Sequence, residues 1–270
     1  MRYRLLALDL DGTLLRADHR VDDDDVAAIS ELQAAGVTVT IVTGRLQSGA
    51  VDAARACAID GAIACCEGSH LVDLATNRTL AHHPMGAEVI TTLRSAFTTH
   101  GLASFVFDAA GIHHDHAGAP FAHYISTWSP NLRVVEQHLA WETMPIAAVA
   151  IGDQDAVASA FATLRAHADA LFSVSFAVSQ CPGKYAVLAR AAGPTKGTAL
   201  TELCARVGCS LSEAVAVGDW VNDVPMFEVA GRSFAMGNAP DAVRLKATDS
   251  LTRAAGTGGG IAEAIRRAWG

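Results

Sequence analysis

The strongest constraint on the fold is an alternation of short apolar strands with helices near the start of the chain. Residues 4–8, 37–42 and 61–66 are apolar or β-branched runs that predict strands, and helical stretches separate them. Strands joined by helices pair in parallel, because each helix carries the chain back across one face of the sheet. The sequence therefore predicts an α/β core with a parallel sheet.

The first expected helix, over residues 22–36, begins with a run of aspartates that ends at Asp25, and it stops at Gly36. Carboxylates stabilise the N-terminal end of a helix, and glycine commonly follows the last helical turn. This gives the aspartate run a structural explanation. A calcium site is the alternative interpretation.

The alternation stops after about residue 82 and returns near residue 196. The intervening segments mix helices and strands in an order typical of an α+β domain: helices at 86–100 and 155–168, and strands at 102–108, near 112, and at 144–151, 172–177 and 185–190. The first pattern then resumes: helices at 197–207, 224–230 and 261–269, and strands at 214–217 and 233–236. The sequence predicts a core of residues 1–82 and 186–270, with an α+β cap domain inserted at 83–185.

Charge and composition exclude several classes of partner. The chain has 270 residues, of which 51% are hydrophobic, and 28 acidic against 20 basic residues give a net charge of -8. Nucleic-acid binding depends on basic surface, so a polymeric nucleic-acid partner is not expected. The most apolar internal segment, 145–151, is far shorter than a membrane span, and Asp9 interrupts the N-terminus before a signal-peptide core can form. We expect a soluble protein without an export signal.

The cysteines point to a reducing environment. All six lie in apolar surroundings without a C-x-x-C spacing, which favours buried, reduced thiols: Cys57, Cys65, Cys66, Cys181, Cys204 and Cys209. A cytoplasmic location is the expectation that follows.

Polar residues come directly after several expected strands. Asp9 and Asp11 follow the first strand, where alternation puts both side chains on one side; Thr43 follows the second, and Asp219 follows the strand at 214–217. Ligands of parallel α/β sheets bind beyond the carboxyl ends of the strands. Carboxylates gathered there repel one another unless a cation lies among them, and their hard oxygens suit Mg²⁺.

Other residues supply groups that hold phosphate. Thr43 offers a hydroxyl beside Gly44, Lys196 is an isolated cation at a helix start, and Asn222 and Asp223 follow Asp219. Hydroxyl, backbone N–H, ammonium and amide groups together suit the oxygens of a phosphate that Mg²⁺ neutralises. The sequence thus predicts a magnesium and phosphate site.

Four motifs in this order resemble those of the haloacid dehalogenase (HAD) superfamily of phosphotransferases: Asp9-Leu-Asp11-Gly-Thr-Leu, Val-Thr43-Gly44-Arg, Pro-Thr-Lys196-Gly, and Gly-Asp219-x-x-Asn222-Asp223-x-x-Met. The inserted segment and the Ala-Met-Gly-Asn-Ala run at 235–239 resemble the Cof-type branch, which carries a large α/β cap. The likeness spans the whole chain. It implies a Rossmann-like parallel core of the HAD fold, with the cap inserted.

The resemblance also implies roles for these residues. Asp9 would be the nucleophile that forms an aspartyl-phosphate, and Asp11 the general acid and base. Mg²⁺ would be held by Asp9, the backbone carbonyl of Asp11 and Asp219, with Asp223 orienting a water or Lys196 beside them. The Asp9–Asp11 pair favours phosphate-ester chemistry over cleavage of carbon–halogen or carbon–phosphorus bonds.

The remaining implied contacts are those to the phosphoryl group. Its oxygens would bind Thr43, Gly44, Asn222 and Lys196, the last of which would also pair with Asp9. The expected enzyme is a Mg²⁺-dependent phosphatase that acts on a small phosphorylated metabolite, such as a sugar phosphate, a phosphorylated cofactor or a nucleotide, as a monomer or small homo-oligomer. A phosphosugar mutase and a catalytically idle metabolite-binding regulator are the alternatives. A Rossmann oxidoreductase would need a G-x-G-x-x-G turn where this chain has Asp-Leu-Asp-Gly-Thr.

Two segments depart from the Cof-type pattern. The stretch at 255–261 is rich in glycine where those proteins often carry an acidic loop, and we expect a flexible turn there before the last helix rather than a phosphate cradle. Glu67-Gly68 stands where Asn-Gly is common, a change we interpret as a turn substitution.

The histidine-rich stretch at 113–116, close in sequence to His82 and His83, invites a transition-metal interpretation. Strand alternation would put His114 and His116 on one face, enough for a partial site, and an exposed hairpin is the expected alternative. A third hypothesis is that His114 or His116 recognises substrate. Arg45 and Trp128 are the other specificity candidates, although Trp128, like Trp141, is expected to serve packing.

Overall fold

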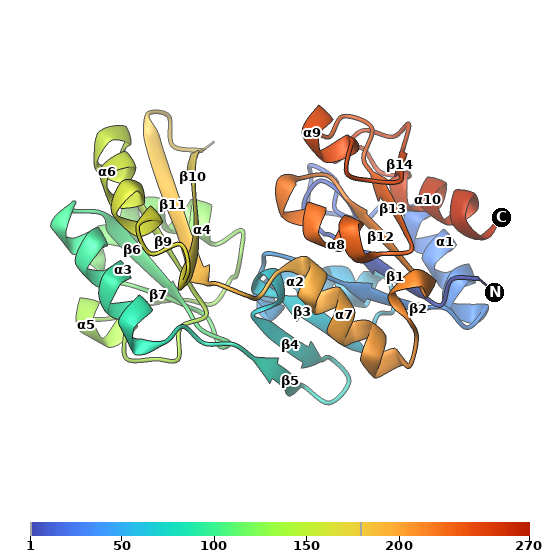
Figure 1. Cartoon of the computed structure of the whole chain (residues 1–270), viewed down its shortest axis with the longest axis horizontal. Coiled ribbons are helices and arrows are strands. Elements are labelled where there is room, and N and C mark those ends of the chain that lie inside the picture. Colours follow the sequence, from blue (N-terminus) through green and yellow to red (C-terminus); the bar gives the residue numbers. More distant parts are fainter. Residues whose placement is uncertain (1, 179) are drawn as a thin grey trace. The chain divides into compact units, whose positions relative to one another are not determined.

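The computed structural model describes residues 2–178 and 180–270, and the chain folds into two compact units. Unit 1 comprises Met1–Gly44, Ala50–Ala81 and Pro194–Gly270, and unit 2 comprises Arg45–Gly49 and His82–Gly193. Figure 1 labels their elements. Each unit has its own sheet and its own hydrophobic core.

Unit 1 is built on a parallel five-stranded sheet in the order β14-β13-β12-β1-β2. Its strands are β1 (Leu5–Leu8), β2 (Thr38–Ile41), β12 (Ala214–Gly218), β13 (Arg232–Ala235) and β14 (Asp249–Ser250). The four apolar residues of β1 are all buried, as a central parallel strand covered on both faces requires. Leu8 at its end is in register with Val217 of β12 and Ile41 of β2, so the three strands end at one edge.

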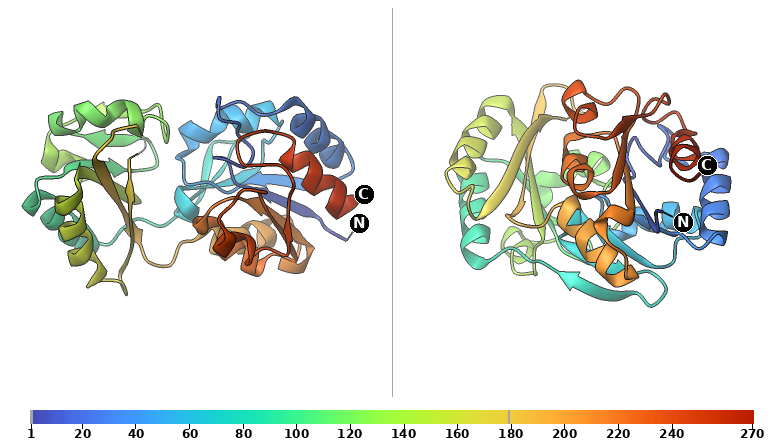
Figure 2. Two further views of the ribbon diagram at one scale, coloured as in Figure 1. Left: turned by 90° about the horizontal axis from the view of Figure 1, so that it is seen from above. Right: turned by 45° about the vertical axis from the view of Figure 1, so that its right-hand side comes forward.

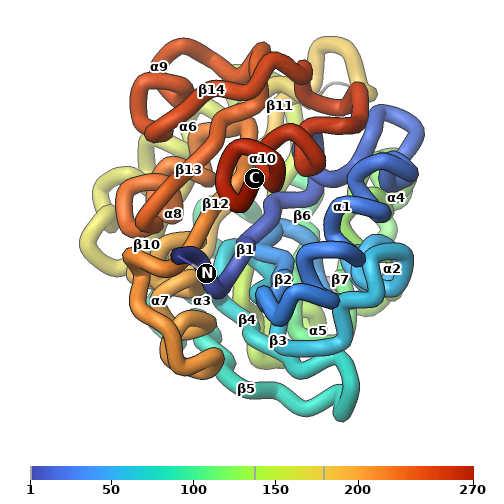
Figure 3. Tube along the Cα trace, turned by 90° about the vertical axis from the view of Figure 1, so that its right-hand side faces the viewer, coloured from blue at the N-terminus to red at the C-terminus, as the bar shows by residue number. Residues whose placement is uncertain are grey.

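Helices cover both faces of this sheet, as Figures 2 and 3 show. One face carries α1 (Asp23–Ala34), α2 (Gln47–Ala56) and α10 (Gly260–Trp269), and the other carries α7 (Lys196–Val207), α8 (Val224–Val229) and α9 (Asp241–Arg244). Alternate residues of β1 serve the two layers: Leu6 packs with Ile29 and Ile261, and Leu5 with Leu200. The predicted parallel α/β core is confirmed.

The third predicted strand has a different role from the one expected. β3 (Ala62–Cys65) is joined to the main sheet by a bridge between Val42 and Ala64 instead of a full ladder, and it pairs antiparallel with β4 (His70–Asp73). β5 (Arg78–His82) completes a separate three-stranded sheet. The β4–β5 hairpin has no counterpart among the predicted elements.

Unit 2 contains a six-stranded sheet in the order β10-β11-β9-β6-β7-β8. Its strands are β6 (Ala103–Phe107), β7 (Ile112–His114), β8 (Leu132–Val134), β9 (Ala147–Asp153), β10 (Leu171–Ala177) and β11 (Lys184–Ala191). The helices α3 (Ala87–Thr99) and α6 (Gln154–Arg165) pack on it through residues such as Phe97 and Leu164, and α4 (Ala122–Ile125) and α5 (Gln137–Ala140) are short. This is the α+β organisation predicted for the insert.

The limits of the units differ from the predicted ones at two places. The expected return to the core at residue 186 falls inside β11, whose hydrogen bonds to β9 and β10 keep it in unit 2. Unit 1 therefore resumes at Pro194. Residues 45–49 also belong to unit 2, where the backbone N–H of Leu46 donates to the carbonyl of Trp128 at 3.1 Å.

In the part of the chain that the structure describes, no helix is both long enough and apolar enough to span a membrane. All six cysteines are free thiols, and four of them are buried: Cys57, Cys65, Cys66 and Cys204. Burial raises the pKa of the Cys57 and Cys204 thiols to about 12, so both stay protonated at neutral pH. Cys181 and Cys209 are partly exposed, unlike the others.

Candidate active site

Asp9 and Lys196 meet at the carboxyl edge of the unit 1 sheet. Asp9 follows β1 directly, its backbone N–H donates to the carbonyl of Val217 at 3.0 Å, and the residue is only 5% exposed. Lys196 opens α7 behind the N-cap Thr195 and is fully buried. Its Nζ donates to Oδ1 of Asp9 at 2.5 Å and to Oδ1 of Asp223 at 2.6 Å. One ammonium therefore joins two carboxylates that lie far apart in the sequence.

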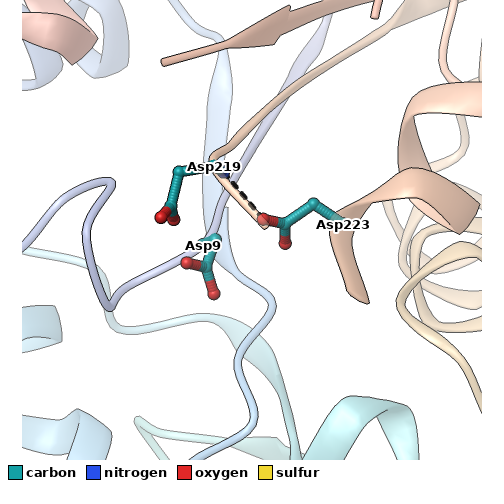
Figure 4. A group of neighbouring side chains, drawn as sticks. All are labelled: Asp9, Asp219 and Asp223. Carbon is teal, nitrogen blue, oxygen red and sulfur yellow. Dashed lines mark hydrogen bonds between the residues drawn. The ribbon is translucent and has the colours of Figure 1, made fainter. Parts of the chain in front are cut away.

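Three carboxylates converge here from the ends of β1 and β12 and from the short 3₁₀ helix η4 (Val221–Asp223), as Figure 4 shows. Asp9, Asp219 and Asp223 each bring one oxygen within 4.8 Å of the others. Oδ2 of Asp223 accepts the backbone N–H of Asp219 at 2.8 Å and that of Trp220 at 2.9 Å, while its Oδ1 accepts from Lys196. Because these bonds occupy Asp223, Asp9 and Asp219 are the carboxylates placed to hold a cation.

The electrostatics of this cluster are unfavourable for three ionised carboxylates. Burial raises the pKa of Asp9 well above its usual value, and the charges of Asp223 and Asp219 add to this against the opposing effect of Lys196. Burial and the charge of Asp223 likewise raise the pKa of Asp219 to about 6. A divalent cation between Asp9 and Asp219 would remove this repulsion and favour both ionised forms.

Lys196 supplies a positive charge to the site. Its burial alone would lower the pKa of the ammonium, but the carboxylates of Asp223 and Asp9 outweigh burial and hold that pKa well above its usual value. The lysine is therefore charged at neutral pH. It can stabilise negative charge that develops beside Asp9.

Asp11 lies in a turn rather than on a continuation of β1. β1 ends at Leu8, and residues 9–14 form a tight turn in which the N–H of Leu14 donates to the carbonyl of Asp9 at 3.3 Å. Asp9 is buried and Asp11 is exposed, so the two side chains are not equivalent. Gly12 adopts φ +83°, and a Cβ there would stand 2.6 Å from Oδ2 of Asp219. The close carboxylate partners of Asp9 are thus Asp219 and Asp223, while the charge of Asp11 contributes to raising the pKa of Asp219.

The residues expected to bind phosphate lie beside the end of β2. Thr43 is fully buried, its N–H donates to the carbonyl of Ala64 at 2.9 Å, and its carbonyl accepts the N–H of Glu67 at 3.0 Å. Oε1 of Glu67 accepts a hydrogen bond from Nδ2 of Asn222 at 2.8 Å. A Cβ on Gly44 would stand 2.7 Å from the same Oε1. Glu67 was predicted only as a turn residue, and the available signal was its place in a motif position that usually holds asparagine.

A family model described as haloacid dehalogenase-like hydrolase matches residues 6–265. The chain belongs to this family. It is 29% identical over 257 residues to the pyridoxal phosphate phosphatase YbhA of Escherichia coli (strain K12), covering 92% of each chain. It is 27% identical over 242 residues to an HMP-PP phosphatase of Yersinia pseudotuberculosis serotype O:1b (strain IP 31758), covering 88% of this chain and 85% of that protein.

Solved structures agree with this membership. A haloacid dehalogenase-like hydrolase from Bacteroides thetaiotaomicron superposes with a TM-score of 0.84 at 24% identity, covering 98% of this chain and 99% of the other. The family model and the curated relatives confirm the predicted superfamily and the assignment as a hydrolase, and the superposition confirms the fold class.

The glycine-rich loop of this HAD-like hydrolase supports the turn that carries Asp9 and Asp11. The N–H of Gly256 donates to the carbonyl of Gly12 at 2.9 Å, and the carbonyl of Gly256 accepts from Ala17 at 3.0 Å. Buried Asp25 of α1 accepts the N–H groups of Gly259 and Ala262 at 2.9 and 2.7 Å, which fixes the start of α10. The loop is therefore a hydrogen-bonded support rather than a flexible turn.

The aspartate run has the structural role predicted for it. Asp22 caps α1 by accepting the N–H of Asp24 at 3.1 Å, and Asp25 makes the bonds to the loop before α10. Among the described residues, the acidic cluster that could hold a metal ion is the one at Asp9, Asp219 and Asp223. The calcium interpretation of residues 22–25 therefore finds no support.

The histidine-rich stretch does not form the predicted arrangement. β7 ends at His114, so alternation does not extend to His116, which is exposed at the start of a 3₁₀ helix (His116–Phe121). His113 and His114 are buried, which contradicts the exposed hairpin: Nε2 of His113 bonds to Oδ2 of Asp108 at 2.8 Å, and Nδ1 of His114 to the carbonyl of Asp115 at 2.7 Å. Within the described residues, no histidine belongs to a metal-like cluster.

The other specificity candidates also lie in unit 2. Arg45 is 8% exposed, and its guanidinium donates to the carbonyl of Gly49 at 3.1 Å. Trp128 packs against the rings of Phe107 and Tyr124, and Trp141 packs against Phe97, as expected for packing residues.

Proposed function

We propose that this HAD-like hydrolase is a Mg²⁺-dependent phosphatase that hydrolyses small phosphorylated metabolites through an aspartyl-phosphate. The observation that carries the proposal is the placement of Asp9 between buried Lys196 and the carboxylate of Asp219. With Mg²⁺ bound beside Asp219, Asp9 would be an ionised nucleophile between two cations, which suits attack on a phosphate ester. Two relatives are named pyridoxal phosphate phosphatase and HMP-PP phosphatase, which supports a small phosphorylated metabolite as the substrate class.

The donor set fits a hard divalent cation. Asp9 and Asp219 would hold Mg²⁺ with the backbone carbonyl of Asp11, and Asp223 would stay beside them because its oxygens are engaged by Lys196 and backbone N–H groups. When bound, the ion neutralises charge on the phosphoryl oxygens and keeps Asp9 ionised.

Each step of the reaction is assigned to residues of the chain itself. A carboxylate oxygen of Asp9 bonds to phosphorus as the ester oxygen leaves, and Asp11 gives that oxygen its proton. Asp11 next takes a proton from the water that attacks the aspartyl-phosphate, which releases phosphate and restores Asp9. Lys196 stabilises the charge in both steps, and Thr43, Gly44 and Asn222 orient the phosphoryl oxygens.

The test is phosphate release from a panel of phosphomonoesters, with and without Mg²⁺, by the wild type and by Asp9→Asn. We expect turnover only with the metal and a loss of at least about 10³-fold in kcat for the variant. Asp60→Asn removes an exposed carboxylate from the same unit and should leave kcat unchanged. Metal-independent turnover, or an Asp9→Asn variant as active as Asp60→Asn, would contradict the proposal.

A further inference from the structure

Glu67 forms hydrogen bonds with Thr43 and Asn222, two of the residues proposed to bind phosphate, yet the mechanism above gives it no role. It belongs to the 3₁₀ helix η1 (Cys66–Gly68), which directly follows β3. Its backbone N–H bonds to the carbonyl of Thr43, and its side chain accepts a hydrogen bond from Asn222, a residue 155 positions away. Glu67 therefore links the end of β2 to the loop after β12.

The backbone around Glu67 is held in an uncommon conformation. Cys66 and Glu67 have φ values of +50° and +60°, in the left-handed region that non-glycine residues rarely adopt. Gly68 follows at φ +94°, and a Cβ there would stand 2.7 Å from the carbonyl oxygen of Thr195, the N-cap of α7. Such conformations persist where the surroundings over-determine them, and they cluster at functional sites.

The hydrogen bond to Glu67 selects one orientation of the Asn222 amide. An ionised carboxylate can only accept, so Asn222 must turn its NH₂ group, not its oxygen, toward Glu67. One N–H is used in this bond at 2.8 Å, which leaves the amide a second N–H as a possible donor, while its Oδ1 is buried without a hydrogen-bond partner. Without Glu67 the amide could rotate and present its oxygen to a phosphate, which would repel it.

The carboxylate also carries a cost at this place. Its charge adds to those of Asp223 and Asp9 in raising the pKa of Lys196, and its Oε1 lies 2.7 Å from the point where a Cβ on Gly44 would stand. A negative charge beside phosphate-binding groups repels a phosphate dianion. Positioning and repulsion thus act in opposite directions, and variants that keep the hydrogen bond but remove the charge separate them.

We propose that Glu67 is a positioning residue that holds the Asn222 amide ready to donate to the phosphoryl group. The proposal rests on the phosphatase function proposed above. It predicts that Glu67 acts on substrate binding through Asn222 and leaves the chemical step at Asp9 largely unchanged.

The test measures kcat and KM for the best ester with Glu67→Ala, Glu67→Gln, Asn222→Ala and the Glu67→Ala/Asn222→Ala double variant. We expect Glu67→Ala to raise KM about 10-fold with kcat within about threefold, the effect of losing one charge-assisted hydrogen bond. Glu67→Gln should stay within about threefold in KM, because its amide oxygen can accept the same bond without the charge. The double variant should be no worse than Asn222→Ala. Glu31→Ala, which removes an exposed glutamate of α1, is the matched control.

Three results would overturn the proposal: a KM for Glu67→Ala within twofold of the wild type, additive effects in the double variant, or a Glu67→Gln variant as impaired as Glu67→Ala. Asp9→Asn tests the phosphatase function separately. Should the wild type hydrolyse no ester, calorimetric binding of inorganic phosphate in the presence of Mg²⁺ replaces KM. In that case, equal phosphate affinity of the wild type and Glu67→Ala overturns the proposal.

Discussion

Two clusters of ionisable residues, one in each unit, differ in how far apart in the sequence their interacting members lie. In unit 1, Asp9 and Lys196 are 187 positions apart in the sequence, and Asp9, Asp219 and Asp223 face one another in a buried setting. In unit 2, His113 bonds to Asp108, five residues away, and His114 bonds to the next residue's carbonyl. Buried charges that face like charges cost free energy and indicate a functional site. Buried polar groups that bond to near neighbours in the sequence indicate a structural role.

Among the variants that test this comparison, Lys196→Met should have the largest effect on stability and activity. The change leaves Asp9 and Asp223 without the ammonium that joins them, so we expect the free energy of unfolding to fall by about 3–5 kcal/mol. Activity should fall at least about 10³-fold, because the proposed mechanism relies on Lys196 to stabilise charge in both chemical steps. Urea unfolding and phosphate release measure the two effects. Lys246→Met, at an exposed ion pair with Glu228, is the control, and an equal response from both variants would break the comparison.

Asp25→Ala tests a different kind of buried carboxylate in unit 1, because the two oxygens of Asp25 accept backbone N–H groups. Losing both bonds should lower the free energy of unfolding by roughly 2–4 kcal/mol. The neighbouring variant Asp24→Ala, at an exposed position, should lower it by less than about 1 kcal/mol. Urea unfolding of the pair checks this, and equal stability of the two variants would refute the structural role given to Asp25.

Asp219→Asn, unlike the two preceding variants, should raise the free energy of unfolding of the metal-free protein. Its pKa is raised from 3.8 to about 6 on folding, so the folded state binds this proton more tightly than the unfolded chain does. The metal-free wild type therefore loses stability as pH rises from about 4 to about 6 and stays at the lower value above that range. Removing the charge should raise the free energy of unfolding at pH 7 by about 1–3 kcal/mol, while Mg²⁺-dependent activity is lost.

Thermal unfolding of the wild type and Asp219→Asn in chelator, at pH 4.5 and pH 7, measures this effect. The variant should gain more in stability over the wild type at pH 7 than at pH 4.5, because most of the wild type's loss falls between these two pH values. A variant less stable than the wild type at pH 7 would show that the carboxylate cluster is not repulsive.

The smallest effects are expected in the histidine cluster. His113→Asn should lower the free energy of unfolding by about 1–2 kcal/mol through loss of the bond to Asp108. His116→Ala, at an exposed position, should change neither stability nor KM for any ester by more than about twofold. Kinetics on the ester panel and calorimetry with Zn²⁺ check both variants. A selective rise in KM for one ester would support the hypothesis that this stretch recognises substrate.

The sequence predicts those parts of the molecule that follow from local pattern plus sheet geometry. The apolar run of β1 and the parallel pairing of β1, β2 and β12 bring their carboxyl ends to one edge, so the meeting of Asp9 and Asp219 could be foreseen. The exposure of Asp11 could not, because the tight turn after Leu8 replaces strand alternation there. Glu67 escaped prediction because its partner Asn222 is distant in sequence and its φ of +60° is set by tertiary packing.

The contacts of the turn that carries Asp9 have a consequence for how the protein folds. The turn bonds to Val217 and Gly256, and the ammonium beside it comes from Lys196, 187 positions from Asp9. Unit 2 lies between these two parts of unit 1 in the sequence. Contacts between distant parts of a chain form more slowly than local ones, because the intervening loop must close first. The Asp9 site is therefore completed late in folding, when the two separated parts of unit 1 have come together.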